Sequence, residues 1–318
     1  MFRLRLAPDD TKIPFMKGRY AGLIVSAVLS TLSIILFFYP GLNYGIDFVG
    51  GVVIEARTPQ AADFPALRGS LGHLGLGQVA LQQFGSAQDV LIRFERQPGG
   101  EQAQQVAVEK VRAALNKDFV GTQIRRVEAV GASVSGELFR NGMLALGLAI
   151  LAMLIYIWFR VEWQVGLGAV VTLILDITKT IGFYAITDLQ FNLTAIAAIL
   201  TIMGYSINDK VVVYDRVREN LRIYKKMPLR ELIDRSINDT LNRTLGTSMT
   251  VFLACLPLAL FGGEALEEFA WVLLFGIVIG TSSSIFIAAP ILLFLGEGRL
   301  RRGTLKEQEA AAAEGAEG

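Results

Sequence analysis

Three polar residues interrupt a long apolar segment near the middle of the chain. Asn208, Asp209 and Lys210 lie within a run that is apolar enough to cross a bilayer and that reaches its charged end only at Asp215. An aspartate near the centre of a membrane helix costs about 2.5–3.5 kcal/mol, so it needs a partner, a path lined by water or a proton of its own. The pattern therefore indicates that the rest of the chain is organised around a compensated carboxylate at Asp209.

Arg243 stands at the start of the next apolar segment, at a depth that matches that of Asp209. At about 1.5 Å per residue, both residues lie within one or two helical turns of the same membrane face, so two antiparallel helices would bring them together. Movement of Arg243 toward or away from the carboxylate would then couple protonation to a change of conformation. A static ion pair that only orients two helices is the alternative.

Asp176 and Lys179 form a second charged pair inside an apolar segment. They are three positions apart and share one helix face. A buried lysine neutralises a neighbouring aspartate and removes a site that would otherwise hold a cation. We therefore expect Asp176, Lys179 and Asn208 to act as accessory polar residues, with Lys179 as a counter-charge that favours protons over sodium ions.

The composition indicates a membrane protein and excludes several kinds of site. Hydrophobic residues make up 53% of the 318 residues, and the mean hydropathy of +0.47 is typical of several membrane spans. A net charge of +1 gives no support for nucleic-acid binding. One cysteine, Cys255, and one histidine, His73, leave no disulfide, cysteine-based metal cluster or catalytic triad, and no phosphate-binding loop is present. We expect no enzymatic activity, no cofactor and no metal.

Six apolar runs predict a polytopic α-helical membrane protein with six transmembrane helices. The runs cover residues 20–39, 138–159, 163–186, 191–214, 244–262 and 269–295. Basic residues precede the first run and gather on alternate connections, at Arg160, from Arg216 to Arg243 and from Arg299 onward, whereas the connections at 187–190 and 263–268 have none. Because basic connections stay in the cytoplasm, residues 1–19 and a disordered tail at 296–318 are predicted to be cytoplasmic.

Residues 41–137 are predicted to form one extracytoplasmic domain. Strand patterns occur at 52–57, 78–84, 89–95 and 122–130, and helical patterns at 61–74 and 101–116. This β-α-β-β-α-β order is typical of a ferredoxin-like α+β domain. Four residues before its first strand indicate a tight turn, namely Gly45, Asp47, Gly50 and Gly51.

Residues 215–243 are predicted to form a cytoplasmic loop that contains an amphipathic helix. Apolar residues recur at helical spacing from Leu229 to Leu241, and Pro228 suits the start of a helix. We expect this helix to lie on the membrane surface and to orient the next span. A docking site for a soluble partner is the alternative.

Four motifs, in this order, resemble the SecF family, the partners of SecD in the accessory complex of the bacterial Sec protein translocase. The motifs are YGIDFVGG at 44–51, GYSINDKVVVYDRVREN at 204–220, RTLGTS at 243–248, and LFGGEALEEF with GIVIGTSSSIFIA at 260–288. The resemblance implies half of a transporter of the resistance-nodulation-division superfamily in the cytoplasmic (inner) membrane. It also implies that the ion-transporting Asp and Arg of the family fall on Asp209 and Arg243. Leu175, where relatives usually have His before the Asp, and Lys179 depart from the family pattern.

The resemblance implies a function in protein export. With SecD, such a subunit uses the proton motive force to complete translocation of unfolded secreted polypeptides through the SecYEG translocon, with YajC and YidC as further partners. Two alternatives stay open, a structural subunit that stabilises the translocon or an insertase without passing ions, and an autonomous exporter of small molecules. A scaffold has no need of a buried Asp209 with an Arg at matching depth. The basic flank after Met1 favours a SecD encoded separately.

Overall fold

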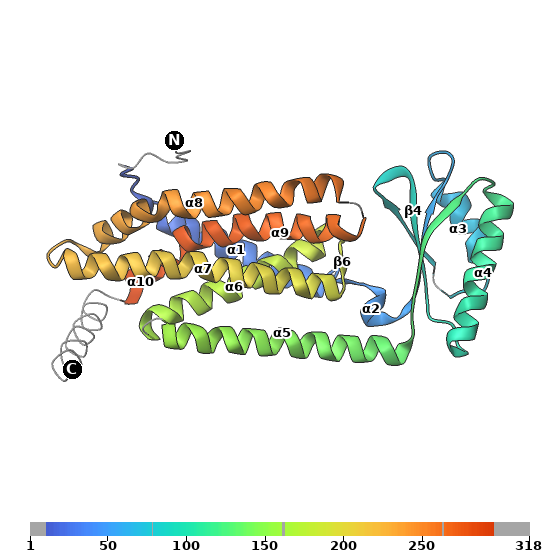
Figure 1. Cartoon of the computed structure of the whole chain (residues 1–318), viewed down its shortest axis with the longest axis horizontal. Helices are drawn as coiled ribbons and strands as arrows, with labels where there is room; N and C mark the ends of the chain where they lie inside the picture. The colour runs from blue at the N-terminus through green and yellow to red at the C-terminus, as the bar shows by residue number, and fades with distance from the viewer. Residues whose placement is uncertain (1–10, 78, 161–162, 263, 296–318) are drawn as a thin grey trace. The chain divides into compact units, whose positions relative to one another are not determined.

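Figure 1 shows the computed structural model of the chain, which describes residues 11–295 except residues 78, 161–162 and 263. The chain divides into two compact units. The α+β unit consists of residues 43–145 and 190–196. The helical unit consists of residues 1–42, 146–189 and 197–318, so the predicted tail at 296–318 and the basic residues from Arg299 onward lie outside the described residues.

The α+β unit contains a four-stranded antiparallel sheet in the order β3-β4-β2-β5. The strands are β2 (Gly51–Arg57), β3 (Val79–Phe84), β4 (Ser86–Phe94) and β5 (Gln123–Val130), and the helices are α3 (Phe64–Gly72) and α4 (Gly100–Asp118). Helices α3 and α4 cover the same face of the sheet in Figure 1. The predicted ferredoxin-like order is therefore confirmed, and each strand lies within a few residues of its predicted position.

Alternate side chains of the central strand β2 point into the hydrophobic core of the α+β unit. Val52, Ile54 and Ala56 face the helices and are almost fully buried, together with Leu67 of α3 and Val111 of α4. Burial of each such large apolar side chain contributes about 1.5–3 kcal/mol. Helix α3 begins where Asp63 caps it, because the Asp63 carboxylate accepts a hydrogen bond from the Ala66 amide at 3.1 Å.

In the described part of the chain, six helices are long and apolar enough to cross a membrane, which confirms the predicted polytopic architecture. They are α1 (Arg19–Phe38), α5 (Ala132–Arg160), α6 (Trp163–Thr187), α7 (Leu193–Ile223), α8 (Leu229–Phe261) and the sixth span that begins with α9 (Glu264–Ser283). The sixth span continues through a π-helical turn, η2 (Ser284–Ala288), into α10 (Ala289–Leu295). Pro290 accounts for the irregular turn, since it has no amide to donate to Phe286 one turn earlier.

The expectation of a separate surface helix before the fifth span is wrong. Residues 229–261 form one continuous helix, α8, because no proline separates the amphipathic segment from the apolar run and Gly246 alone does not break a helix. The apolar face that was expected to meet lipid is buried within the protein, as Leu232 and Ile233 have no exposed surface. The N-terminal segment also contacts this part of α8, since the Met16 amide donates to Asp234 at 2.7 Å.

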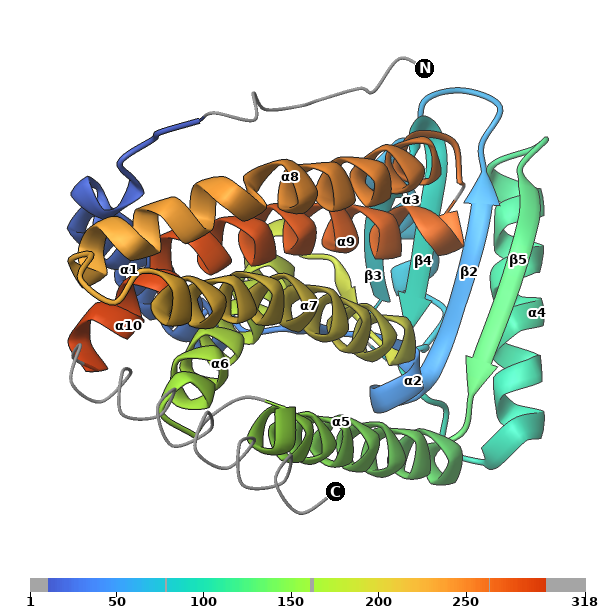
Figure 2. The same ribbon diagram turned by 60° about the vertical axis from the view of Figure 1, so that its left-hand side comes forward.

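The helical unit exposes apolar side chains on its outer faces. Figure 2 shows α8 and α9 running side by side, with α7 along the same bundle. In α1, by contrast, a narrow stripe of Ser26, Ser30 and Ser33 is buried, whereas Ile24, Ile35 and other large apolar side chains are exposed. Such a surface suits lipid or another membrane protein rather than water.

Candidate functional site

Three consecutive residues of α7 meet three different surroundings, because each step along a helix turns the side chain by about 100°. Asn208 lines a hollow between helices. Asp209 is buried beside α8, with Arg243 and Thr247 among the groups that act on it. Lys210 reaches Asp176 of α6 and Ser283 of α9. The three polar residues that interrupt the apolar segment therefore make different contacts.

Lys210 is fully buried, and its ammonium lies among four oxygen atoms. It donates to Asp176 Oδ2 at 2.8 Å, to Ser283 Oγ at 3.2 Å, to the Ser206 carbonyl at 3.3 Å and to Ser206 Oγ. Ser206 and Lys210 are four residues apart on one face of α7, so both side chains reach the same point. No role was predicted for Lys210, although its spacing from Ser206 is visible in the sequence.

Asp176 is the centre of this cluster. Its Oδ2 accepts hydrogen bonds from Ser206 Oγ at 2.8 Å and Ser283 Oγ at 2.7 Å as well as from Lys210. Lys179, the expected counter-charge, lies 3.6 Å from Asp176 Oδ1, which has no hydrogen-bond partner. Asp176 and Lys179 do share a helix face, but Lys210 is the nearer and more fully buried cation.

Asp209 is only 2% exposed, and its Oδ2 has no hydrogen-bond partner among the residues that the structure describes. The cations that act on its carboxylate are Lys210 and Arg243, named in order of strength. Among the described residues, no ion pair within 4.0 Å joins Asp209 to Arg243. Asp209 and Arg243 thus lie on two helices that contact one another, α7 and α8, as the bond between Tyr205 and Ser248 shows.

A chain of hydroxyl groups crosses the bundle one turn away from Asp209. Tyr205 of α7 donates to Ser248 of α8 at 2.7 Å, and Ser248 is hydrogen bonded to Thr281 of α9 at 2.7 Å. Asp209 also acts electrostatically on the Tyr205 phenol. Hydroxyl groups both donate and accept, so such a chain can pass a proton between helices.

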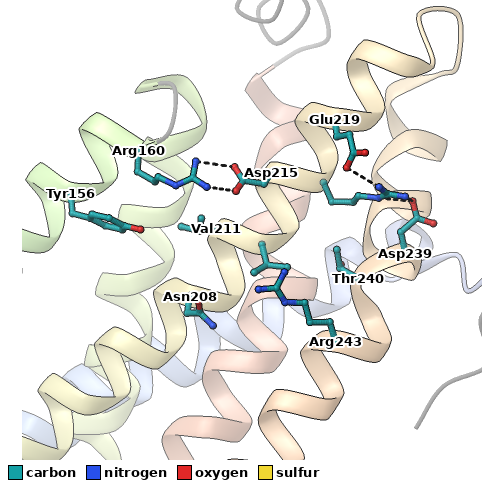
Figure 3. A pocket seen from close by; sticks show the side chains of 11 residues that line it. Tyr156, Arg160, Asn208, Val211, Asp215, Glu219, Asp239, Thr240 and Arg243 are labelled. Atoms are coloured by element: carbon teal, nitrogen blue, oxygen red, sulfur yellow. Dashed lines mark hydrogen bonds and ion pairs between the residues drawn. The ribbon is translucent and has the colours of Figure 1, made fainter. Parts of the chain in front are cut away.

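A hollow of about 690 Å³ is lined by residues of α5, α7 and α8 (Figure 3). Arg243 extends from α8 toward α7 in this view. Two ion-pair networks flank the hollow: Arg160 holds Asp215 through contacts of 2.5 and 3.3 Å, and Arg216 holds Glu219 at 2.7 Å and Asp239 at 2.8 Å. Asn208 and Arg243 are thus reached from a polar opening, whereas Asp176 is enclosed.

The glycine motif builds a structural link within the α+β unit. It contains the short strand β1 (Asn43–Tyr44) and the helical turn α2 (Ile46–Val49), and β1 pairs in parallel with β6 (Gln190–Phe191), where the sequence predicted a loop or the edge of a span. Asp47 accepts a hydrogen bond from the Leu193 amide at 3.1 Å and so caps the first turn of α7.

The close packing of this motif requires its glycines. Gly50 and Gly51 have φ values of 76° and 124°, which disfavour other residues, and a Cβ atom on Gly51 would lie 2.8 Å from the Phe94 carbonyl. A Cβ atom on Gly45 would lie 2.8 Å from Asn192. The expected tight turn is confirmed, whereas the cap on α7 was not predicted, since it joins residues far apart in sequence.

Comparison with known proteins places this geometry in a family. The profile described as "Protein export membrane protein SecD/SecF, C-terminal" matches residues 110–298, and the "SecD/SecF GG Motif" matches residues 35–62. A curated protein translocase subunit SecF of Rickettsia felis is 44% identical over 307 residues, covering 96% of this chain and 99% of the relative. The chain belongs to the SecF family.

Other relatives agree with this assignment. The SecF protein of Rickettsia akari is 46% identical over 293 residues, covering 92% of this chain and 94% of the relative. A crystal structure of SecDF from Thermus, described as a translocon-associated membrane protein, matches with a TM-score of 0.82 and 31% identity over 92% of this chain. A second SecDF structure, in a super-membrane-facing form, has a TM-score of 0.59 and 28% identity over 98% of this chain. The chain spans about 40% of the longer SecDF chains.

Proposed function

We propose that the chain is the SecF subunit of a SecDF complex, in which proton movement through Asp209 drives the last stage of protein export. The observation that carries this proposal is the state of Asp209, a buried carboxylate with an unpartnered oxygen and with Arg243 and Lys210 nearby. A carboxylate that is held inside a membrane bundle without a fixed ion pair is suited to binding and releasing a proton. A static scaffold gains nothing from such a group.

The proton leaves Asp209 past Arg243 toward the hollow in this proposal. Arg243 and Asn208 line the hollow, so they connect the neighbourhood of Asp209 with an opening flanked by charged residues. The Arg243 guanidinium approaches the Asp209 carboxylate when the carboxylate is charged and withdraws when the carboxylate is protonated. This change in attraction shifts α8 against α7, and the shift is the conformational step coupled to proton transfer.

The charge distribution supports a cytoplasmic position for the hollow and for both termini. The ion pairs of Arg160 and Arg216 lie beside the hollow, and the N-terminal residue Met16 contacts Asp234 near the start of α8. Basic residues gathered at one end of a helical bundle favour the cytoplasmic side. The ferredoxin-like domain then lies outside the cytoplasm, where an unfolded secreted polypeptide emerges.

The partners in this proposal are SecD, which supplies the second half of the transporter, and the SecYEG translocon. YajC and YidC are proposed as further members of the assembly. Lipid covers part of the exposed apolar surface of the six spans, and SecD covers the remainder. The chain itself carries out no covalent chemistry and needs no cofactor or metal, so its energy comes from the ion gradient.

Export of a preprotein into membrane vesicles tests the proposal. The vesicles contain this chain, SecD and SecYEG, and export is measured with and without an imposed proton gradient. We expect the gradient to accelerate export with wild-type protein and to have no effect with Asp209→Asn. Equal acceleration in both proteins would favour the structural-subunit alternative.

Glu109→Gln is the matched control, because it removes one carboxylate without touching the helical unit. Glu109 is exposed on α4 and has only a long contact of 3.8 Å with Arg112. Its variant should keep the full response to the gradient. A loss of response in Glu109→Gln as well would show that the assay reports assembly rather than proton transfer.

A further inference from the structure

The surroundings of the Lys210 ammonium have the composition of a cation site. The four oxygen atoms around it come from a carboxylate, two hydroxyls and a backbone carbonyl, and they belong to α6, α7 and α9. Asp176, Ser206 and Ser283 are each at most 1% exposed. Hard cations in proteins are bound by oxygen ligands of these kinds.

The charge of these ligands identifies the class of cation. Asp176 is the one carboxylate among them, and the Ser206 and Ser283 oxygens are neutral. A single carboxylate provides too little charge for a divalent ion in a dry site. The cage is therefore suited to a monovalent cation.

We propose that Lys210 is a tethered cation, whose ammonium fills a monovalent-cation site built by Asp176, Ser206 and Ser283 and thereby excludes a free alkali cation from it. The ammonium supplies the single positive charge at the point where these oxygen atoms converge. Ser283 is the last residue before the π-helical turn, an irregularity common at functional sites. The sequence expectation gave the counter-charge role to Lys179, and the geometry gives it to Lys210.

The charge of the cluster is compatible with a free cation in place of the ammonium. Lys179 lies 3.6 Å from the opposite oxygen, Oδ1, and would remain as one cation against one carboxylate. In a variant without Lys210, a bound alkali ion and Lys179 would together place two positive charges beside Asp176, as Lys210 and Lys179 do in the wild-type protein. Removal of Lys210 would also leave a cavity lined by polar groups, which is large enough for an ion rather than an apolar void.

The consequence of this inference for ion coupling rests on the proposed function. If Lys210 permanently fills the Asp176 site, Asp176 cannot exchange ions with the gradient, and Asp209 alone remains as the carrier carboxylate of this chain. The specificity of coupling is then set by Lys210, one residue after Asp209. The binding site itself is tested without export, so failure of either proposal is recognised separately.

Thermal unfolding of the purified full chain in detergent tests the site, with KCl and NaCl each compared against choline chloride at equal ionic strength. Wild-type protein should show the same Tm in all three salts. Lys210→Ala should gain a saturable stabilisation by K⁺ or Na⁺, with a Tm increase of about 2–4 °C at a concentration about five times the Kd. Absence of stabilisation by both ions would overturn the proposal.

Two variants control for the loss of charge and for the cavity. Lys210→Met removes the ammonium but fills its volume, so it should show no specific effect of K⁺ or Na⁺. Lys210→Ala combined with Asp176→Asn keeps the cavity but removes the carboxylate, and it should lose the stabilisation. A response that persists in either control would place the cation elsewhere and overturn the assignment.

Two measurements replace Lys210→Ala if that variant fails to fold. The first uses Lys210→Ser, for which we expect the same stabilisation by K⁺ or Na⁺, and the second uses wild-type protein. A saturable stabilisation of wild-type protein by K⁺ that disappears in Asp176→Asn would show that the site is open to free cations. That result would contradict the tethered-cation proposal directly.

Discussion

The ammonium of Lys210 lies 2.8 Å from Asp176 Oδ2, although the two residues are 34 positions apart in the chain. The pair is almost completely buried and joins α6 to α7, while Ser283 links both to α9. Asp209, the neighbour of Lys210, keeps one carboxylate oxygen unpartnered. Two aspartates of the same bundle thus differ in kind, because one is neutralised by a fixed cation and the other is not.

Removal of one member of the buried pair should destabilise the protein strongly. Asp176→Leu leaves the Lys210 ammonium without its carboxylate and should lower the free energy of unfolding by about 3–5 kcal/mol. The double variant Asp176→Leu/Lys210→Met replaces the pair by apolar side chains and should recover most of this loss. Unfolding in detergent of the single and double variants gives the coupling free energy. If the losses of unfolding free energy in the two single variants add up to the loss in the double variant, the two residues do not stabilise the protein as a pair.

Arg243 should be needed for the response to the proton gradient but not for folding. Its side chain lines the hollow and is exposed, so Arg243→Met should leave Tm nearly unchanged. Export in vesicles should fall to the rate seen without a gradient, and Arg243→Lys should retain part of the acceleration because it keeps the charge. A large fall in Tm for Arg243→Met would instead assign Arg243 a structural role.

Gly51 should not tolerate a side chain. Its φ of 124° is unfavourable for alanine, and the added Cβ atom would lie 2.8 Å from the Phe94 carbonyl. Gly51→Ala should therefore destabilise the α+β unit by about 2–3 kcal/mol. Gly131→Ala is the control, since nothing lies within 4 Å of its added Cβ atom. Protease susceptibility of β2 and β4 in the two variants measures the difference, and equal effects would contradict this explanation.

Asp89 should contribute a stability that depends on pH. The side chain of Arg57, directly opposite on β2, donates two hydrogen bonds of 2.7 Å to it and holds the pKa of the carboxyl well below its usual range. Because the folded-state pKa is lowered, the stabilisation is fully present above the unfolded-state pKa of about 3.9 and is lost as pH falls through the folded-state value.

Comparison of wild-type protein with Asp89→Asn checks this dependence. Hydrogen exchange of β2 and β4, corrected for the intrinsic exchange rate, should show the largest difference in stability near pH 7. The difference should shrink below about pH 4, where the wild-type carboxyl begins to take up protons in the unfolded state. A difference that stays constant from pH 7 to about two pH units below the unfolded-state pKa would mean that Asp89 acts through its shape rather than its charge.

The sequence by itself determined the six spans, the ferredoxin-like order and the position of Asp209 inside a span. Apolar runs and alternating patterns are local, and a charged residue inside an apolar run is visible without any partner. The glycine motif was also recognised as a tight turn, because Gly50 and Gly51 act through their own backbone conformation. His73, the single histidine of the chain, is exposed at the end of α3.

Only the tertiary structure decided which charges meet. Lys179 is the lysine nearest to Asp176 in sequence, but Lys210 lies closer to Asp176 in space, since α6 and α7 pack with Ser206 and Lys210 facing the carboxylate. The cap that Asp47 provides for α7 likewise joins residues 146 positions apart. Helix periodicity gives the face on which a side chain lies, whereas its partner depends on which helices pack together, and that is a property of the whole fold.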